Sequence, residues 1–333
     1  MRREVRARAP LRISFAGGGT DVPPYPATHG GAVLSVTIER WAVADARVRG
    51  DHAYHVESLD LMARTAFQPD ELVFNGHLDL VKAVLRDLAP GHGLDLTLGT
   101  DAPPGSGLGS SSALVVAMLA AVGATSGRRW SPAELAWRAY QVERVDLKIE
   151  GGMQDQYAAA FGGLNFIEFH GDDQVDVQPL RVRPETIEAL ERSLLLAWSG
   201  SGRTDSGILR RQVDGVLGGS ARSLSSLATI KALAVAMRDA LLAGDLAAFA
   251  AGLHEGWEQK RRLASGIATP RLDELYQLAR AAGAAGGKVP GAGGGGYLLF
   301  CAPPAALPRV AAALEAAGAP CTPVRFTTRG AHW

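Results

Sequence analysis

A junction near residue 110 constrains the fold of this chain more than any other feature of its sequence. Residues 103–112 read Pro-Pro-Gly-Ser-Gly-Leu-Gly-Ser-Ser-Ser, and a nearly all-apolar run that includes Ala113, Leu114 and Val116 follows at once. Serines before an apolar run predict a helix start, so we expect a buried helix that begins at a glycine-rich loop. Such a loop offers backbone N–H groups beside a helix N-terminus and favours a polyanion such as a triphosphate. It lacks the Gly-Lys-Ser/Thr of a Walker A loop. A glycine-rich turn capped by serines, without a ligand, is the alternative.

The rest of the chain mixes strand and helix patterns. Alternation predicts strands at 5–15 and 94–98, and apolar runs predict strands at 32–38, 41–48, 194–198, 297–301 and 323–327. Helices are expected at 78–88, 131–146, 154–161, 270–282 and 305–317, with further long Ala/Leu-rich helices between about 220 and 262. Ser131 with Glu134 forms a capping-box pattern. A charged segment with Pro184 suggests a domain boundary near residue 180. The prediction is therefore an α+β protein with domains at 1–180 and 181–333.

Composition excludes several classes of partner. The formal net charge is zero, which disfavours nucleic acid and anionic membranes, and we expect a small-molecule partner instead. Cys301 and Cys321 show no metal-binding spacing, so neither zinc nor a disulfide framework is predicted. The basic N-terminus has no apolar stretch behind it, and no segment is long enough to span a membrane. A cytoplasmic location is expected by default.

Two more glycine clusters complete a family pattern. One runs from Ala9-Pro10-Leu11-Arg12 to Gly-Gly-Gly-Thr-Asp at 17–21, and the other reads Lys-Val-Pro-Gly-Ala-Gly-Gly-Gly-Gly at 288–296. The last cluster fits G-x-G-x-x-G, but a helix precedes it and a strand follows, which is the wrong context for a dinucleotide fold. With the segment at 103–112, the three clusters resemble, in order, the motifs of the GHMP kinases, which include galactokinase, homoserine kinase, mevalonate kinase and phosphomevalonate kinase. The resemblance implies an N-terminal domain like ribosomal protein S5 domain 2 and a ferredoxin-like C-terminal domain.

The same resemblance implies site residues for ATP- and Mg²⁺-dependent phosphoryl transfer. Asp155 would accept or orient the proton of the acceptor, and Arg12 would stabilise negative charge near the nucleophile. Ser111 and Glu143 would hold Mg²⁺. The ATP-binding residues would be Pro104, Gly105, Ser106, Gly107, Leu108, Gly109, Ser110, Ser111 and Ser112.

Each of these residues also has a plain structural interpretation. Glu143 could be a solvated helix carboxylate, and Asp155 a helix N-terminal residue stabilised by the dipole. Arg12 could be an exposed strand cation, and Asp21 a turn aspartate before Val22-Pro23-Pro24. Only the family resemblance favours the catalytic interpretation.

Finer detail suggests the substrate. Gly-Gly-Gly-Thr-Asp-Val-Pro-Pro-Tyr at 17–25 and Gly-Gly-Met-Gln-Asp-Gln-Tyr at 151–157 look most like the heptose 7-phosphate kinases of this family. They imply transfer to the anomeric hydroxyl, with heptose 1,7-bisphosphate as product. Arg203 would bind the substrate's own phosphate, because arginine binds phosphate bidentately, and Lys288 with the last glycine loop is the other candidate. The expected substrate-binding residues are Gly18, Gly19, Thr20, Asp21, Asp155, Arg203, Lys288, Gly293 and Gly294.

Two alternatives stay open at this point. One is a kinase of fucose or another unphosphorylated sugar, although fucokinases carry Gly-Gly-Trp-Ser-Asp in the first motif. The other is a sugar sensor of the same fold without catalysis, which the presence of Ser111, Glu143 and Asp155 disfavours. The sequence leaves the oligomeric state open, a homodimer included.

Overall fold

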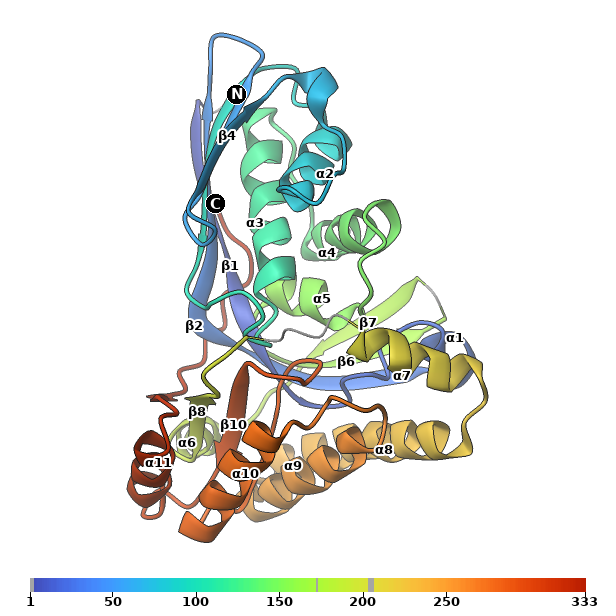
Figure 1. The fold of residues 1–333 in the computed structure, drawn as a ribbon, viewed down its shortest axis with the longest axis vertical. Helices are drawn as coiled ribbons and strands as arrows, with labels where there is room; N and C mark the ends of the chain where they lie inside the picture. Colours follow the sequence, from blue (N-terminus) through green and yellow to red (C-terminus); the bar gives the residue numbers. More distant parts are fainter. Residues whose placement is uncertain (1–2, 172, 203–206) are drawn as a thin grey trace.

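A seven-stranded sheet forms the upper part of the molecule in the computed structural model, which describes residues 3–171, 173–202 and 207–333 (Figure 1). Its strands run in the order β4-β3-β5-β2-β6-β7, and β1 pairs with β2. All pairs are antiparallel except β3 with β5. The strands are β1 (Glu4–Ala16), β2 (Gly31–Val48), β3 (Tyr54–Ser58), β4 (Ala63–Phe67), β5 (Leu94–Thr100), β6 (Leu164–His170) and β7 (Gln174–Pro179).

Sequence patterns identified only part of this sheet. The alternating run at 5–15 is β1, as predicted. The prediction of separate strands at 32–38 and 41–48 is wrong, because both belong to the single strand β2. Its register with β1 shifts between Pro10 and Leu11, so the strand passes through an irregularity instead of ending. Strands β3, β4, β6 and β7 were not predicted.

Helices cover one face of this sheet (Figure 1). They are α2 (Asp79–Leu88), α3 (Ser110–Thr125), α4 (Pro132–Tyr140) and α5 (Gln154–Phe161). Helix α3 is buried except at Ser110, Ser111 and Leu114, which explains why it is apolar on all sides. The capping box at Ser131 and Glu134 is confirmed. The helix predicted to continue to 146 instead ends at Tyr140 and passes into a π-helical segment, Gln141–Asp146.

A second, four-stranded sheet lies below the first in Figure 1, in the order β11-β8-β10-β9. Its strands are β8 (Leu194–Trp198), β9 (Gly286–Lys288), β10 (Tyr297–Cys301) and β11 (Cys321–Pro323). Its helices are α8 (Ala221–Ala243), α9 (Leu246–Arg261), α10 (Pro270–Ala282) and α11 (Leu307–Ala316). The helices predicted between 220 and 262 are confirmed as α8 and α9, and Gly244 ends α8 with a positive φ of 80°. The predicted last strand 323–327 is wrong in position, because β11 ends at Pro323.

The remaining elements are short. They are α1 (Tyr25–His29), the 3₁₀ turn Pro69–Glu71, α6 (Pro184–Glu191) and α7 (Ile208–Leu217). The predicted domain boundary near residue 180 falls between β7 and α6. Phe249 of α9 packs edge-on against Phe15 of β1, with ring centroids 5.0 Å apart. Helix α9 therefore belongs to the same apolar core as the first sheet.

The C-terminal tail returns from the second sheet to the first, so the two chain ends lie near the same strands (Figure 1). Backbone bridges join Phe326 to Ile38 and His332 to Arg8. Thr37 is buried, donates to the carbonyl of Thr327 at 2.7 Å and accepts the N–H of Gly163 at 2.6 Å. Through these contacts the tail holds the segment that follows α5. In the described ranges, no helix has both the length and the apolar character needed to cross a membrane.

Candidate active site

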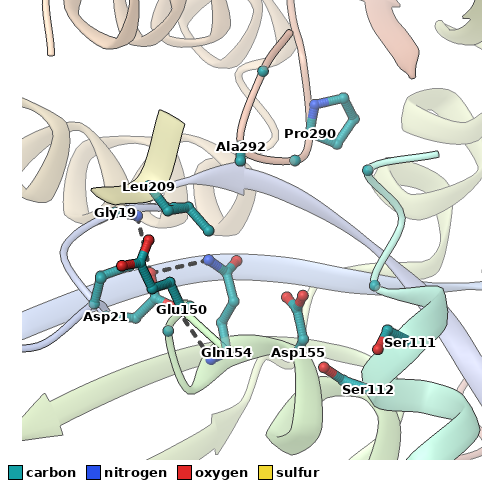
Figure 2. Close-up of a pocket in the computed structure, with 18 of the residues that line it drawn as sticks. Gly19, Asp21, Ser111, Ser112, Glu150, Gln154, Asp155, Leu209, Pro290 and Ala292 are labelled. Atoms are coloured by element: carbon teal, nitrogen blue, oxygen red, sulfur yellow. Dashed lines mark hydrogen bonds between the residues drawn. The ribbon is translucent and has the colours of Figure 1, made fainter. Parts of the chain in front are cut away.

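Segments far apart in the sequence meet around a cavity of about 220 Å³. Its walls come from the first glycine cluster, the loop before α3, the turn before α5, helix α7 and the last glycine cluster. Figure 2 shows Asp155 between the Asp21–Gln154 side and the Ser111–Ser112 side. The lining residues predicted from sequence are Arg12, Gly18, Gly19, Asp21, Gly105, Ser106, Gly107, Gly109, Ser110, Ser111, Ser112, Glu143, Asp155 and Gly293.

The loop before α3 presents backbone donors to this cavity. Gly105, Gly107 and Gly109 have φ values of 73°, 81° and 74°, a left-handed conformation that glycine adopts readily. Helix α3 has no side-chain cap, and its first internal bond runs from Ala113 to Gly109. The N–H groups at the start of α3 are therefore available to an anion, and the helix dipole adds to the attraction.

Glu143 lies at one end of the cavity, beside the start of α3. It is 1% exposed and belongs to the π-helical segment, a type of irregularity that often occurs at functional sites. Ser111 Oγ donates to its Oε1 at 3.0 Å, and Ser112 Oγ donates to its Oε2 at 2.6 Å. Gln156 Nε2 also donates to Oε2, at 2.5 Å. Three donors hold a buried carboxylate against the helix N-terminus.

Asp155 and Arg12 form an ion pair across the cavity floor. The guanidinium Nε and Nη2 of Arg12 both reach Asp155 Oδ1, at 2.8 and 2.7 Å, and its Nη1 donates to the carbonyl of Gly107 at 2.6 Å. Arg12 is 4% exposed, so the interpretation as an exposed strand cation is wrong. Asp155 Oδ2 accepts no hydrogen bond from the described residues. One carboxylate oxygen is thus fixed and the other is available in the cavity.

Asp21 forms the opposite end of the cavity. It is fully buried, and its Oδ1 accepts from the N–H of Gly19 at 2.9 Å and from Gln154 Nε2 at 3.0 Å (Figure 2). Its Oδ2 accepts the N–H of Gln154 at 3.2 Å. Burial raises the pKa of Asp21, against the lowering effect of the Gly19 hydrogen bond, and the nearby Asp155 charge raises it further. A Cβ on Gly152 would lie 1.9 Å from Oδ2, so only glycine permits this approach.

Other predicted residues lie outside the cavity lining. Thr20 is buried, and its hydroxyl donates to the carbonyl of Gly17 at 2.8 Å and accepts the N–H of Ala32 at 3.1 Å, which stabilises the first glycine turn. Lys288 is buried and donates to the carbonyl of Phe15 at 3.0 Å. Pro104, Leu108 and Gly294 do not line the cavity either. Arg203 lies outside the described residues.

Several residues in and around the cavity were not predicted from sequence. Gln154 lines the cavity and Gln156 donates to Glu143, and their place on either side of Asp155 in the 151–157 motif was the available signal. Gln212 of α7 and Lys260 of α9 line the cavity although no motif surrounds them. Lys260 is 6% exposed and donates to the carbonyl of Gly291. The residues next to it in the sequence are charged, a pattern typical of a helix face that is exposed to solvent.

Comparison with known proteins supports a single family. The model of the GHMP kinases N terminal domain matches residues 77–163, and that of the GHMP kinases C terminal matches residues 237–320. A D-glycero-alpha-D-manno-heptose 7-phosphate kinase of Campylobacter jejuni is 35% identical over 306 residues, which is 90% of each chain. A Bacteroides fragilis L-fucokinase/L-fucose-1-P guanylyltransferase is 31% identical over 90% of this chain, which spans only 34% of that longer protein.

Solved structures agree with these matches. A D-glycero-D-manno-heptose 1-phosphate kinase from Bacteroides thetaiotaomicron superposes with a TM-score of 0.82 at 33% identity, over 98% of both chains. A galactokinase from Lactococcus lactis has a TM-score of 0.80 at 19% identity, over 99% of this chain and 95% of that one, and supports the fold alone. The predicted α+β architecture and family are confirmed: the chain belongs to the GHMP kinases, a family of ATP-dependent phosphotransferases.

Proposed function

We propose that this enzyme transfers a phosphoryl group from ATP to the anomeric hydroxyl of a heptose 7-phosphate, giving heptose 1,7-bisphosphate, with Mg²⁺ bound at Glu143. The main support is the Asp155–Arg12 pair, which lies between an anion-binding helix N-terminus and a separate polar subsite. Phosphoryl transfer needs an acceptor, a phosphate cradle and charge stabilisation in one place. The relatives named for heptose phosphates support the substrate class.

The sugar would bind at the Asp21–Gln154 side of the cavity. The Gln154 side chain is nine-tenths buried, and its amide carbonyl, Oε1, has no hydrogen-bond partner among the described residues. A buried acceptor without a partner is costly, so a sugar hydroxyl that donates to it would remove that cost. Asp21 holds Gln154 in place through two hydrogen bonds. We infer that Asp21 and Gln154 together bind the sugar hydroxyls next to the reacting carbon.

The nucleotide phosphates would bind at the α3 side. The free N–H groups at the start of α3 and the carboxylate of Glu143 lie at the same end of the cavity. Ser111 Oγ donates to Glu143 Oε1 at 3.0 Å, so a hydroxyl and a carboxylate oxygen lie together, and these two residues would hold Mg²⁺, which prefers oxygen ligands. Within the described ranges no three His, Cys, Asp or Glu side chains form a metal site. This fits Mg²⁺, which commonly takes one or two protein carboxylates with phosphate and water. When bound, it would neutralise phosphate charge.

Asp155 would act on the acceptor hydroxyl. Arg12 fixes Oδ1 through two N–H donors, which leaves Oδ2 to accept the hydroxyl proton as the new P–O bond forms. The Arg12 guanidinium, buried beside the Gly107 carbonyl, stabilises negative charge that develops on the transferred group. The leaving ADP would remain held by the amides of the α3 loop.

An ATP-consumption screen tests the proposal. Purified protein would be assayed with heptose 7-phosphate, the dephosphorylated heptose, fucose, galactose and mannose, and the product identified by phosphorus NMR. The expected result is turnover of heptose 7-phosphate with a new phosphate on the anomeric carbon. Preference for fucose would favour the unphosphorylated-sugar kinase, and sugar binding without ADP release would favour a sensor. Either result would refute the proposal.

A further inference from the structure

Arg144 lines the cavity, and the chemistry proposed above does not use it. It follows Glu143 in the π-helical segment, and its side chain is 11% exposed. Its Nε donates to the Gly152 carbonyl at 3.3 Å and its Nη1 to the Ile149 carbonyl at 3.4 Å. Both distances exceed the roughly 2.9 Å that is most frequent for such hydrogen bonds. The guanidinium is therefore held loosely against the loop that leads to α5.

These contacts leave hydrogen-bond donors of Arg144 unused. A guanidinium carries more N–H groups than two carbonyls satisfy, and its Nη2 finds no acceptor in the part of the chain that the structure describes. Its ion pair with Glu143 is long, with 3.9 Å between Nη1 and Oε1. Arg12, which also lines the cavity, is instead paired with Asp155 at 2.7 Å. A mostly buried cation with weak partners is costly, so an anion that enters the cavity would offset that cost.

Glycine at position 151 makes room for this guanidinium. A Cβ on Gly151 would lie 2.6 Å from both Cζ and Nη2 of Arg144, which is closer than real contacts allow. The backbone of Gly151 lies outside the left-handed region, so its conformation does not require glycine. An added side chain would therefore displace the guanidinium of Arg144 without straining the backbone.

The position of Arg144 selects the anion. Glu143 Oε1, 3.9 Å from its Nη1, also accepts from Ser111 at the start of α3, where the nucleotide phosphates would bind. Gly152, whose carbonyl accepts from its Nε, belongs to the turn before α5 that leads to Asp155. The guanidinium thus extends from the phosphate end of the cavity towards the residue that would accept the proton. The phosphate that must lie between these two points is the terminal one of ATP, since it is the group that is transferred.

We propose that the Arg144 guanidinium binds the terminal phosphate of ATP, as a second cation in addition to Arg12. The inference rests on the proposed sugar phosphate kinase activity and names a residue that recognises the group to be transferred. A planar guanidinium can donate two parallel N–H groups to phosphate oxygens. Asp155 offsets the charge of Arg12, so the transferred group needs further positive charge, which Arg144 supplies as negative charge develops on the oxygens.

Arg144→Met tests the proposal, because methionine keeps the apolar stem and removes the guanidinium. Calorimetry would measure binding of a non-hydrolysable ATP analogue, ADP and AMP, each with Mg²⁺. Affinity for the analogue should fall by about ten- to a hundredfold, the range for loss of one charge-assisted contact. Affinity for ADP should fall much less, and affinity for AMP should stay unchanged. The kcat with heptose 7-phosphate should fall, while the KM for this sugar stays unchanged.

Arg280→Met is the matched control. Arg280 on α10 is also half-buried and donates through Nη1 to two carbonyls of the loop that follows its helix, those of Ala284 and Ala285. It does not line the cavity. This variant should bind the three nucleotides as the wild type does, and equal losses in both variants would overturn the proposal.

A second variant keeps the test valid if Arg144→Met does not fold. Gly151→Ala would displace the guanidinium and should also weaken binding of the ATP analogue more than binding of ADP. An equal loss for all three nucleotides would overturn the proposal and leave Arg144 as a support of the loop. A raised KM for heptose 7-phosphate with unchanged affinity for the analogue would overturn it too, and would assign Arg144 to the phosphate of the acceptor. If the wild type phosphorylates no sugar, the proposed function fails. If it does, and both variants keep the wild-type preference for the analogue over ADP, only the Arg144 site fails.

Discussion

Replacing Asp155 with asparagine tests the proposed chemistry with little change of shape. Asparagine retains an oxygen that can accept from Arg12, so the side chain should keep its place on the cavity floor. It loses the negative charge and the ability of the second oxygen to take a proton. The substitution therefore separates positioning of the acceptor from proton transfer.

The expected effect is large and confined to catalysis. Loss of a positioned general base lowers rates by about 10²- to 10⁴-fold, which raises the barrier by about 3 to 5 kcal/mol. The KM for ATP should stay within about threefold, because the amides and serines at the start of α3 do not depend on Asp155. Steady-state kinetics with varied ATP and varied sugar would measure both effects.

A matched control distinguishes this loss from general damage. Arg138 and Asp87 form another arginine–aspartate pair, 2.8 Å apart, on α4 and α2 away from the cavity. The Asp87 side chain is 27% exposed, against 21% for Asp155. Asp87→Asn should leave kcat unchanged. If Asp155→Asn retained about half of the wild-type kcat or more, or if both variants lost activity equally, the assignment of Asp155 would be refuted.

Three further predictions follow from the same geometry. Ser111→Ala and Glu143→Gln should each raise the Mg²⁺ concentration needed for half-maximal rate, and an unchanged Mg²⁺ titration in both would contradict the metal role. The pKa of Asp21 is raised above its usual 3.8, so the folded state favours the protonated carboxyl. The free energy of unfolding that Asp21 contributes is therefore greatest below pH 3.8 and is lost as the pH rises through the raised pKa. In thermal melts, the stability of the wild type relative to Asp21→Asn should therefore fall between acid and neutral pH. An increase of this stability difference with pH would contradict the predicted direction. Thr37→Val leaves the Gly163 N–H and a tail carbonyl unpaired and should cost about 1–3 kcal/mol in urea unfolding, whereas no measurable loss would show that the tail does not hold this segment.

The sequence alone determined the local features of the site. The loop at 103–112 and the apolar helix after it could be predicted, because glycine conformation, serine capping and burial all depend on a few neighbouring residues. The order of the three glycine clusters identified the family. Strand β1 and the capping box at Ser131 were confirmed for the same local reason. Strands β3, β4, β6 and β7 escaped prediction because their burial depends on the sheet around them.

Tertiary structure decided which of these residues lie together. Arg12 and Asp155 are 143 residues apart in sequence, and Gln154 and Asp21 are 133 residues apart. Local sequence patterns extend over a few residues, so they cannot predict contacts between such distant residues. The clearest case is Lys260, whose charged helical surroundings predict a solvated face. The last glycine loop packs over it and turns it into a buried cation at the cavity wall. Burial and partners of a charged side chain are set by what folds over it, and only the assembled chain supplies that.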